Sequence, residues 1–307
     1  MASLASGTRP GGDAKARDIG DEAEPVPTSI AIPALLEEHA EGIAELRALL
    51  AAELAPAPLP TSDGIACEYD DIFYLRYLLS FSAADKAVAP VLACFAFRAE
   101  PKNRRIAEMA KAGTMETDLR AMVEGPRWQV AGPLSKTDPG SVLQPTSGGG
   151  VFVIIRAAMC DGSGFFDSVT KDEMWEMNLA HREGSFQYCD KLTRETGLLA
   201  KQTMCMDMKG SILSSMMDRR QSASHAEISK ISANVYPQLQ DKFCIVNAPS
   251  WMGWLMSLFR KIASKRSMDK VELFTSDEEM WNSDWAKKRL IRERLPTFMG
   301  GGVIDDD

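Results

Sequence analysis

The segment from residue 203 to residue 274 constrains the fold most, because short apolar runs alternate in it with stretches of helical periodicity. The runs at 203–209, 243–247 and 271–274 have the length and apolar composition of buried strands. Between the first two runs, apolar residues recur every three or four positions from 228 to 239. Strands that alternate with helices form parallel sheets with right-handed crossovers. The sequence therefore predicts an α/β fold with parallel strands and helical crossovers.

The segment from residue 251 to residue 262 differs from an ordinary surface helix, because its first nine residues place apolar side chains on every helical face. At about 1.5 Å per residue it spans roughly 18 Å, which is too short for the roughly 30 Å hydrocarbon core of a bilayer. Two interpretations remain open at this point. The helix is either fully buried in the core, or it covers an apolar cavity and meets a membrane when it moves.

Short motifs around this segment occur in the order and at the separation of a known signature. Tyr-Pro-Gln at 236–238 is followed within 242–249 by an aromatic residue, aliphatic residues and Asn-Ala-Pro. Asp-Met-Lys-Gly at 207–210 ends the first predicted strand, and Ser229 lies in the helix before Tyr-Pro. Together these residues resemble the signature of the CRAL-TRIO lipid-binding family. The resemblance implies a sheet whose parallel strands and helical crossovers enclose an apolar pocket.

The flanking segments extend the resemblance to residues 69–301. Residues 71–78 resemble the Asp-x-x-Leu-Leu-Arg-Phe-Leu motif of the small helical domain that precedes the lipid domain in this family. Residues 79–81 (Leu-Ser-Phe) depart from it, since the family has further arginines there. Residues 295–301 resemble the Leu-Pro-x-x-aromatic-Gly-Gly end of the family's domain, with Phe298 one place early. The resemblance thus implies a small all-α domain ahead of the α/β domain.

The chain divides by composition into three parts. Residues 1–28 are rich in Gly, Ala, Asp, Glu and Pro and carry no apolar stripe, which predicts a disordered tail. The acidic residues in this tail argue against a targeting presequence. We expect an N-terminal helical region at 29–125, resembling the family's helical domain from about residue 69, and the CRAL-TRIO lipid-binding domain at 126–302.

Charge and composition restrict the partners. The formal net charge of −8 argues against nucleic-acid binding, although the basic residues between 260 and 270 suit anionic headgroups. No run of 18 apolar residues occurs, so we expect no transmembrane helix. The six cysteines show no CxxC spacing and are expected to be reduced and buried. These features predict a cytoplasmic protein, and the family resemblance adds peripheral membrane association.

The sequence lacks the common catalytic and cofactor motifs. The glycines at 148–150 precede a predicted strand, whereas a dinucleotide site needs a glycine-rich turn after one. The chain has no GxxxxGK[ST] or GxSxG motif, and its three histidines are too far apart for a zinc pair. Asp207 is the best isolated catalytic candidate, and its structural alternative is a carboxylate that accepts hydrogen bonds from loop amides. We predict no enzymatic activity, no cofactor and no metal.

Methionines concentrate in the predicted strands and helices of the α/β segment. Methionine is flexible and polarizable, so it suits both irregular cores and adaptable binding surfaces, and composition leaves both open. With the family resemblance beside it, the pattern predicts an apolar pocket lined by large side chains of the predicted strands. These are Phe152, Met204, Met206, Phe243 and Ile245.

The resemblance also implies roles for two further groups of residues. In the family, the helix that corresponds to 251–262 is a gate that opens at the membrane. The gate residues here would be Trp251, Trp254, Leu255 and Leu258. Members that take phosphatidylinositol bind its headgroup through a Thr or Ser and a Lys after the gate, and through the glutamate of Tyr-Pro-Glu. The matching residues are Ser267, Lys270 and Gln238.

The predicted function is therefore lipid binding and transfer, with phosphatidylinositol or a related phospholipid favoured. Phosphatidylcholine is less favoured, because members that bind it carry hydroxyl side chains where this chain has Gln202 and Met204. The protein would contact a membrane surface transiently, with a lipid kinase or another protein as a further partner. Two alternatives stay open: a carrier of an uncharged small molecule of the tocopherol or retinoid type, and a protein scaffold that exchanges no lipid.

Overall fold

The computed structural model describes residues 31–112, 143–144, 149–157, 167, 170–211, 219–262 and 268–302. Three predictions fall outside these residues: the N-terminal tail at 1–28, the domain boundary near residue 125, and the headgroup residue Ser267. The side chains of Leu255 and Leu258 also lie outside the description.

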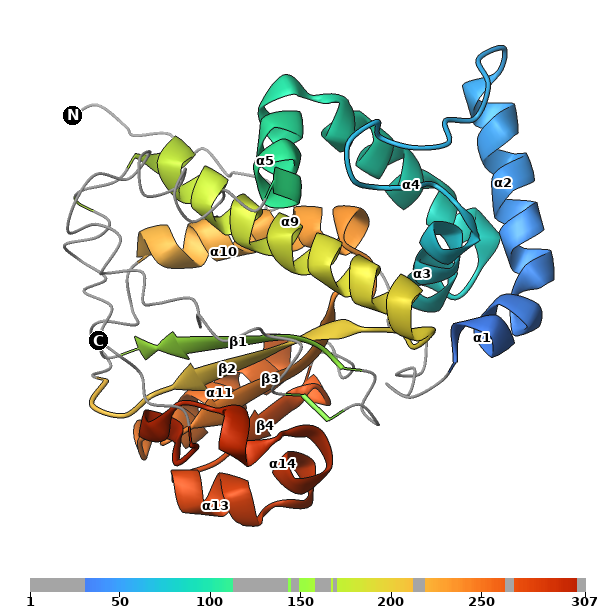
Figure 1. The fold of residues 1–307 in the computed structure, drawn as a ribbon. Helices are drawn as coiled ribbons and strands as arrows, with labels where there is room; N and C mark the ends of the chain where they lie inside the picture. The colour runs from blue at the N-terminus through green and yellow to red at the C-terminus, as the bar shows by residue number, and fades with distance from the viewer. Residues whose placement is uncertain are drawn as a thin grey trace, which may run out of the picture.

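A parallel sheet lies in the middle of the fold (Figure 1). Within the described residues its strands, in spatial order, are β1 (Gly150–Arg156), β2 (Lys201–Asp207), β3 (Gln240–Val246) and β4 (Val271–Leu273). All neighbouring strands run parallel. The chain passes from each strand to the next through α9 (Lys171–Thr196), α10 (Arg219–Val235) and α11 (Trp251–Ile262). The predicted α/β fold with parallel strands and helical crossovers is confirmed.

Helices cover both faces of this sheet, as a parallel sheet requires. Above one face in Figure 1 lie α9, α10 and the N-terminal helices α1 (Ile32–Glu38), α2 (Ala40–Leu54), α3 (Asp71–Phe81), α4 (Ala84–Ala99) and α5 (Pro101–Ala112). Against the other face lie α13 (Asp277–Asn282), α14 (Asp284–Arg289) and the 3-10 turns η5 (Arg292–Arg294) and η6 (Thr297–Met299). Among the described helices, none alone has the length and hydropathy to cross a membrane. The consecutive helices α3 and α4 reach that length and hydropathy only when taken together, and they are bent by 119° relative to each other.

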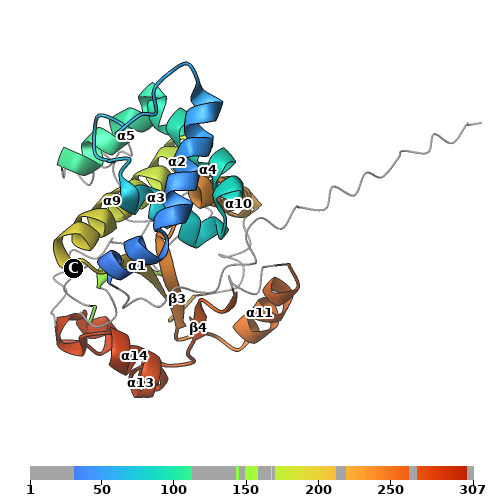
Figure 2. The same cartoon turned by 90° about the vertical axis from the view of Figure 1, so that its right-hand side faces the viewer.

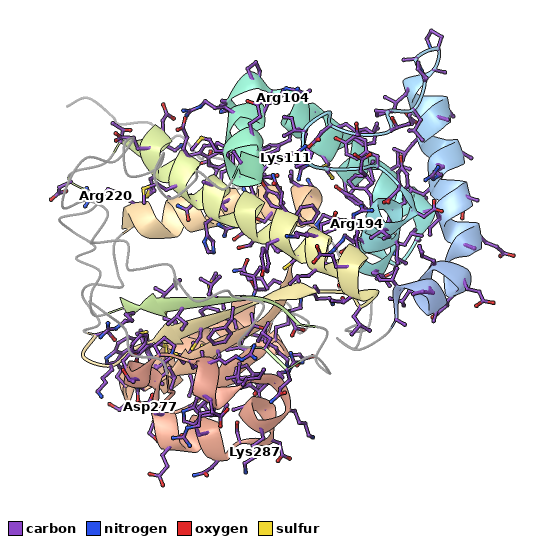
Figure 3. The ribbon with its side chains drawn as sticks, in the orientation of Figure 1. Arg104, Lys111, Arg194, Arg220, Asp277 and Lys287 are labelled. Atoms are coloured by element: carbon purple, nitrogen blue, oxygen red, sulfur yellow. The ribbon has the colours of Figure 1, made fainter. Side chains whose placement is uncertain are left out.

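Capping residues determine where two helices beside the sheet begin. Asp70 accepts a hydrogen bond from the Phe73 amide at the start of α3, and Thr170 and Glu173 form a reciprocal capping box at the start of α9. The Asp70 carboxylate also pairs with Arg194 near the end of α9, at 2.6 Å. Figure 3 shows Arg194 at this end of the helix, beside α3. The start of α3 is thus tied to the end of α9.

One hydrophobic core joins the N-terminal helices to the sheet. Tyr74 and Tyr77 of α3, Val91 of α4, Phe186 of α9 and Val153 of β1 are all buried in it. Figure 2 shows these N-terminal helices stacked beside α9 and α10 on the same side of the sheet. The predicted helical region at 29–125 and the predicted lipid domain at 126–302 therefore share this core.

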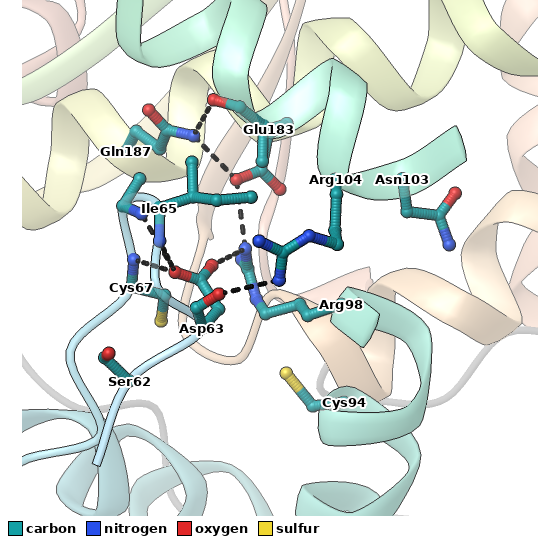
Figure 4. Close-up of polar contacts among 12 residues, drawn as sticks. Ser62, Asp63, Ile65, Cys67, Cys94, Arg98, Asn103, Arg104, Glu183 and Gln187 are labelled. Carbon is teal, nitrogen blue, oxygen red and sulfur yellow. Dashed lines mark hydrogen bonds and ion pairs between the residues drawn. The ribbon is translucent and has the colours of Figure 1, made fainter. Parts of the chain in front are cut away.

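A buried charged cluster connects the segment after α2 to α4 and α9 (Figure 4). One oxygen of Asp63 accepts hydrogen bonds from the amides of residues 65, 66 and 67, at 2.8–3.0 Å. Arg98 of α4 donates to the other oxygen of Asp63 and to Glu183 of α9, both at 3.1 Å. The three side chains are only 2–4% exposed. Arg98 therefore holds two carboxylates from distant parts of the chain in one place.

The hydrogen bonds to Asp63 affect the pKa of its carboxyl group. Burial by itself would raise the pKa of this carboxyl group. The three amide hydrogen bonds and the charge of Arg98 outweigh burial, so the pKa of Asp63 lies below its usual 3.8. A pKa that is lower in the folded state means that Asp63 stabilises the fold above its unfolded pKa. This stabilisation is lost as the pH falls through the folded-state pKa.

We expect Asp63→Asn to lower the free energy of unfolding at neutral pH by roughly 2–4 kcal/mol, because Arg98 stays buried with one of its two charged partners neutralised. The difference from the unsubstituted protein should shrink as the pH falls below 3.8. Urea unfolding at a series of pH values measures both effects.

Glu227→Gln is the matched control. It neutralises an exposed ion pair with Lys171, in which the side chains are 48% and 75% exposed, and should change stability by less than about 1 kcal/mol. Equal losses in the two variants, or a loss in Asp63→Asn that does not vary with pH, would contradict the role of the buried cluster.

Candidate functional site

Four of the predicted pocket residues lie on one face of the sheet. Met204 is the register partner of Phe243, and Met206 is the register partner of Ile245 on the neighbouring parallel strand. Because side chains alternate along a strand, these four residues point to the same side. Met206, Phe243 and Ile245 pack in one cluster with methionines of α11. We refer to Met204, Met206, Phe243 and Ile245 as the apolar face.

Phe152, the fifth predicted pocket residue, lies on the opposite face. Its register partner is Thr203, and it is buried with Ile154 and Cys205 in the core beneath α13 and α14. The prediction that Phe152 shares one apolar surface with the other four residues is therefore corrected. β1 is a parallel strand that is apolar on both faces, so its sequence does not show which side chains point to which side.

The two faces of the sheet are filled to different degrees. Beneath α13 and α14, Cys205, Cys244 and Val246 are 0% exposed. On the apolar face, Met204 and Phe243 are partly exposed, although β2 and β3 each have a strand on either side. Protein interiors are close-packed and leave few voids. The partial exposure of these inner strands therefore marks apolar surface that the described helices cover only in part.

Helix α11 has one side against this apolar face and one side toward solvent. Met252 and Met256, one turn apart, are buried in the cluster that contains Ile245. Trp254 is 56% exposed. No other large hydrophobic side chain among the described residues is classed as exposed. Trp251 packs against the same cluster as the methionines and is only partly buried. Of the two interpretations of this segment, the fully buried core helix is wrong.

Two of the predicted headgroup residues lie at one end of the sheet. Gln238 follows α10 just before β3, and its Nε2 donates to Ser80 Oγ at 3.1 Å. Lys270 precedes β4, and its Nζ donates to the backbone carbonyl of Gln240 at 2.7 Å. Because β3 and β4 are parallel neighbours, the segments before them meet at the same edge. The structure therefore places Gln238 and Lys270 at the same edge, where the strands begin, with Lys270 bonded to Gln240 two residues after Gln238.

The opposite edge of the sheet carries a polar cluster with a structural role. Asp207 accepts hydrogen bonds from the Lys209 amide at 3.0 Å and from Asn247 Nδ2 at 2.9 Å. The second N–H of the Asn247 amide donates to Asp277 at 2.8 Å, and Figure 3 shows Asp277 beneath the sheet, at the start of α13. Asn247 thus bridges two carboxylates. Asp207 therefore accepts a hydrogen bond from a loop amide, as the structural alternative to a catalytic role predicted.

The described residues form no metal cluster, and their cysteines are buried away from solvent. Within the described ranges, no three His, Cys, Asp or Glu side chains gather as a metal site would require. The described cysteines are unbridged and buried. Burial raises the pKa of the Cys189 thiol to about 12, and it also raises the pKa of Cys67 and Cys94. Since the thiolate is the reactive form, these cysteines behave as small hydrophobic residues.

Ser80 is a contact of the candidate site that the sequence did not reveal. It lies 158 positions from Gln238 and reaches it only because α3 packs on the side of the sheet where α10 ends. Its one signal in the sequence is that it belongs to the Leu-Ser-Phe stretch at 79–81, where the chain departs from the family motif. The two departures from the motifs, at Ser80 and at Gln238, are hydrogen-bonded to each other.

Three comparisons relate the chain to known proteins. A family model described as the CRAL/TRIO domain matches residues 136–301. A search of curated protein sequences found no match. Among solved structures, one titled "Crystal structure of Sfh5" is similar with a TM-score of 0.44 and 13% identity, covering 88% of this chain and 94% of that chain. The segment matched by the family model contains β1 to β4 and the helices from α9 to α14.

The Asn247 bridge leads to a prediction about stability. Asn247→Asp replaces the two N–H donors by a third carboxylate between Asp207 and Asp277, so we expect a loss of roughly 2–4 kcal/mol at neutral pH. The backbone φ of 54° at this position is one that Asp tolerates about as well as Asn. Chemical denaturation at neutral pH measures the loss.

Asn282→Asp provides the control, because this exposed residue ends α13 and its substitution should change stability by less than about 1 kcal/mol. A loss in Asn247→Asp no larger than in this control would show that the bridge is unimportant.

Proposed function

The chain belongs to the CRAL/TRIO domain family, and we propose that it binds one phospholipid, with phosphatidylinositol favoured, and transfers it between membranes. The observation that carries this proposal is the partly exposed apolar face, together with the polar and cationic groups at the edge where its strands begin and the exposed tryptophan of α11. Family membership supports lipid binding in general. The choice of phospholipid depends on Lys270 and Gln238.

The apolar face suits the acyl chains. Each buried CH₂ group contributes about 0.8 kcal/mol, so long chains bind where they can replace water over apolar protein surface. Met204, Met206 and Phe243 offer such surface while remaining partly exposed. Methionine side chains have several rotatable bonds and adapt to chains of different shape. We therefore place the acyl chains along these three residues, and Phe152 on the far side of the sheet takes no part.

The edge at which the strands begin suits a phosphate-bearing headgroup. Lys270 supplies an ammonium group, and in the structure this group bonds a neutral backbone carbonyl. A phosphate would accept charge-assisted hydrogen bonds from this ammonium group. Gln238 supplies an uncharged amide where family members that bind phosphatidylinositol have a glutamate. With Ser267 as the third predicted residue, this edge would hold the phosphate and the inositol ring.

Helix α11 is proposed as the gate. Its methionines cover part of the apolar face, so a movement of α11 away from the sheet would open that part to a lipid. Tryptophan favours membrane interfaces, where its ring is shielded and its N–H stays hydrated. Trp254 on the outer side would therefore anchor the helix in a membrane while Met252 and Met256 separate from the sheet. On this proposal the protein works in the cytoplasm as a peripheral membrane protein, and a lipid kinase would be a natural recipient of the lipid.

The proposal is tested by identifying and following the ligand. Organic extraction of the protein purified under native conditions, followed by mass spectrometry, should yield a phospholipid. Labelled phosphatidylinositol should then move from donor to acceptor vesicles faster with the protein than without it. Recovery of an uncharged isoprenoid-like molecule instead would favour the tocopherol or retinoid type of carrier. A protein that holds no amphiphile and accelerates no transfer would be a scaffold.

Lys270 provides the first site-specific prediction. We expect Lys270→Ala to slow phosphatidylinositol transfer by roughly 10-fold, and Lys270→Glu to slow it further, because charge-assisted hydrogen bonds contribute about 1.5–3 kcal/mol. Lys288→Glu makes the same charge change on an exposed lysine of α14 and should leave transfer unchanged. If both Lys270 variants moved phosphatidylinositol at the unsubstituted rate, the phosphoinositide assignment would be wrong.

Trp254 provides the second site-specific prediction. We expect Trp254→Asp to weaken binding to vesicles by roughly 10-fold or more, because a charge replaces the aromatic side chain that favours the interface. Its stability should change by less than about 1 kcal/mol, since the side chain is exposed. Vesicle sedimentation and thermal unfolding measure the two effects.

Met256→Asp is the matched control on the buried side of α11, and it should lose several kcal/mol of stability because it buries a charge. A melting temperature lowered by tens of degrees in Trp254→Asp, with transfer per folded molecule unchanged, would make α11 an ordinary part of the core.

A further inference from the structure

The hydrogen bond between Gln238 and Ser80 joins two distant parts of the fold. Gln238 is 9% exposed, and its Nε2 donates to the Ser80 hydroxyl oxygen at 3.1 Å. Its backbone φ is 58°, which lies in the left-handed region that is unfavourable for a long side chain. Unfavourable backbone conformations persist only where the surroundings hold them, and they cluster at binding sites. A buried amide held in this way is therefore a candidate for a specific role.

The Ser80–Gln238 pair lies at the same edge of the sheet as Lys270. Gln238 precedes Gln240 by two residues, a span of at most about 7 Å, and the carbonyl of Gln240 accepts the Lys270 ammonium. The amide of Gln202 donates to the carbonyl of the intervening Leu239 at 2.6 Å, which ties this turn to the start of β2. A neutral hydrogen-bonding pair and a cation therefore share the edge at which the apolar face begins.

We propose that Ser80 is a positioning residue that holds the Gln238 amide, and that this neutral pair makes the site select hydroxyl-bearing headgroups over quaternary ammonium headgroups. The inference rests on the proposed phospholipid function and adds the residue that determines the class of headgroup. Lys270 would recognise the phosphate that both classes of lipid carry. The Ser80–Gln238 pair would distinguish a hydroxyl-bearing group from a quaternary ammonium group attached to that phosphate.

The chemistry of the two side chains gives this selectivity its direction. Ser80 accepts one N–H of the Gln238 amide, which determines how the amide is turned. The amide retains a second N–H donor and a carbonyl acceptor. A hydroxyl group both donates and accepts, so a polyol matches this pair of groups. A quaternary ammonium group has no N–H or O–H and binds best to aromatic faces or carboxylates, and the Ser80–Gln238 pair has neither.

Competing vesicle transfer tests the inference. Donor vesicles carry labelled phosphatidylinositol or labelled phosphatidylcholine at equal content, and the ratio of the two transfer rates is measured. We expect Ser80→Ala to lower the ratio of phosphatidylinositol to phosphatidylcholine transfer by roughly 3- to 10-fold, the range for one neutral hydrogen bond. Ser80→Thr keeps the hydroxyl group and should restore the ratio. Gln238→Met should lower the ratio, and the double variant Ser80→Ala/Gln238→Met should lower it no further, because the pair acts as a unit.

The outcomes separate the inference from the function on which it rests. If the unsubstituted protein transfers neither lipid, the phospholipid function fails and the inference fails with it. If it transfers phosphatidylinositol but Ser80→Ala slows both lipids equally, Ser80 supports only the fold and the inference alone is overturned. Additive effects of the two substitutions, or a ratio that Ser80→Thr does not restore, would likewise overturn it. Circular dichroism of each variant confirms that the rates compare folded proteins.

Discussion

The alternation of side chains across the parallel sheet creates two different environments on either side of one layer. Cys205 and Cys244, register partners on β2 and β3, point into a closed core beneath α13 and α14. One residue along each strand, Met204 and Phe243 point to the other side and stay partly exposed. The core beneath α13 and α14 is closed, whereas Met204 and Phe243 on the other face keep part of their apolar surface accessible. The proposed lipid site depends on this difference.

Buried ionic groups determine where the N-terminal helices lie relative to that sheet. Arg98 holds Asp63 and Glu183, and the buried Arg76 donates to Thr193 of α9 at 2.9 Å. The attraction within such groups largely offsets their desolvation, but removing one partner leaves another charge buried without compensation. These contacts tie α3 and α4 to α9. It places Ser80, near the end of α3, within hydrogen-bond distance of Gln238.

Helix α11 meets two different surroundings at once. Its buried methionines contact the apolar cluster of the sheet, while Trp254 faces outward. A helix that is apolar on both sides loses little when its inner side exchanges protein for hydrocarbon, because the transfer free energy of apolar surface is similar in both. In water alone the same movement would expose methionines and would be unfavourable. The membrane itself can therefore supply the condition under which the proposed gate opens.

The sequence by itself determined the parallel α/β fold, the family, and the positions of Gln238 and Lys270 at the starts of neighbouring strands. These properties follow from local periodicity and from motifs that are continuous in the chain. Only the tertiary structure decided that Phe152 lies on the far face, that Trp254 is exposed, and that Ser80 bonds Gln238. A strand covered on both faces is apolar at every position, so it carries no alternating signal. Exposure and contacts between distant residues arise from how whole elements pack, and no local pattern in the chain encodes that packing.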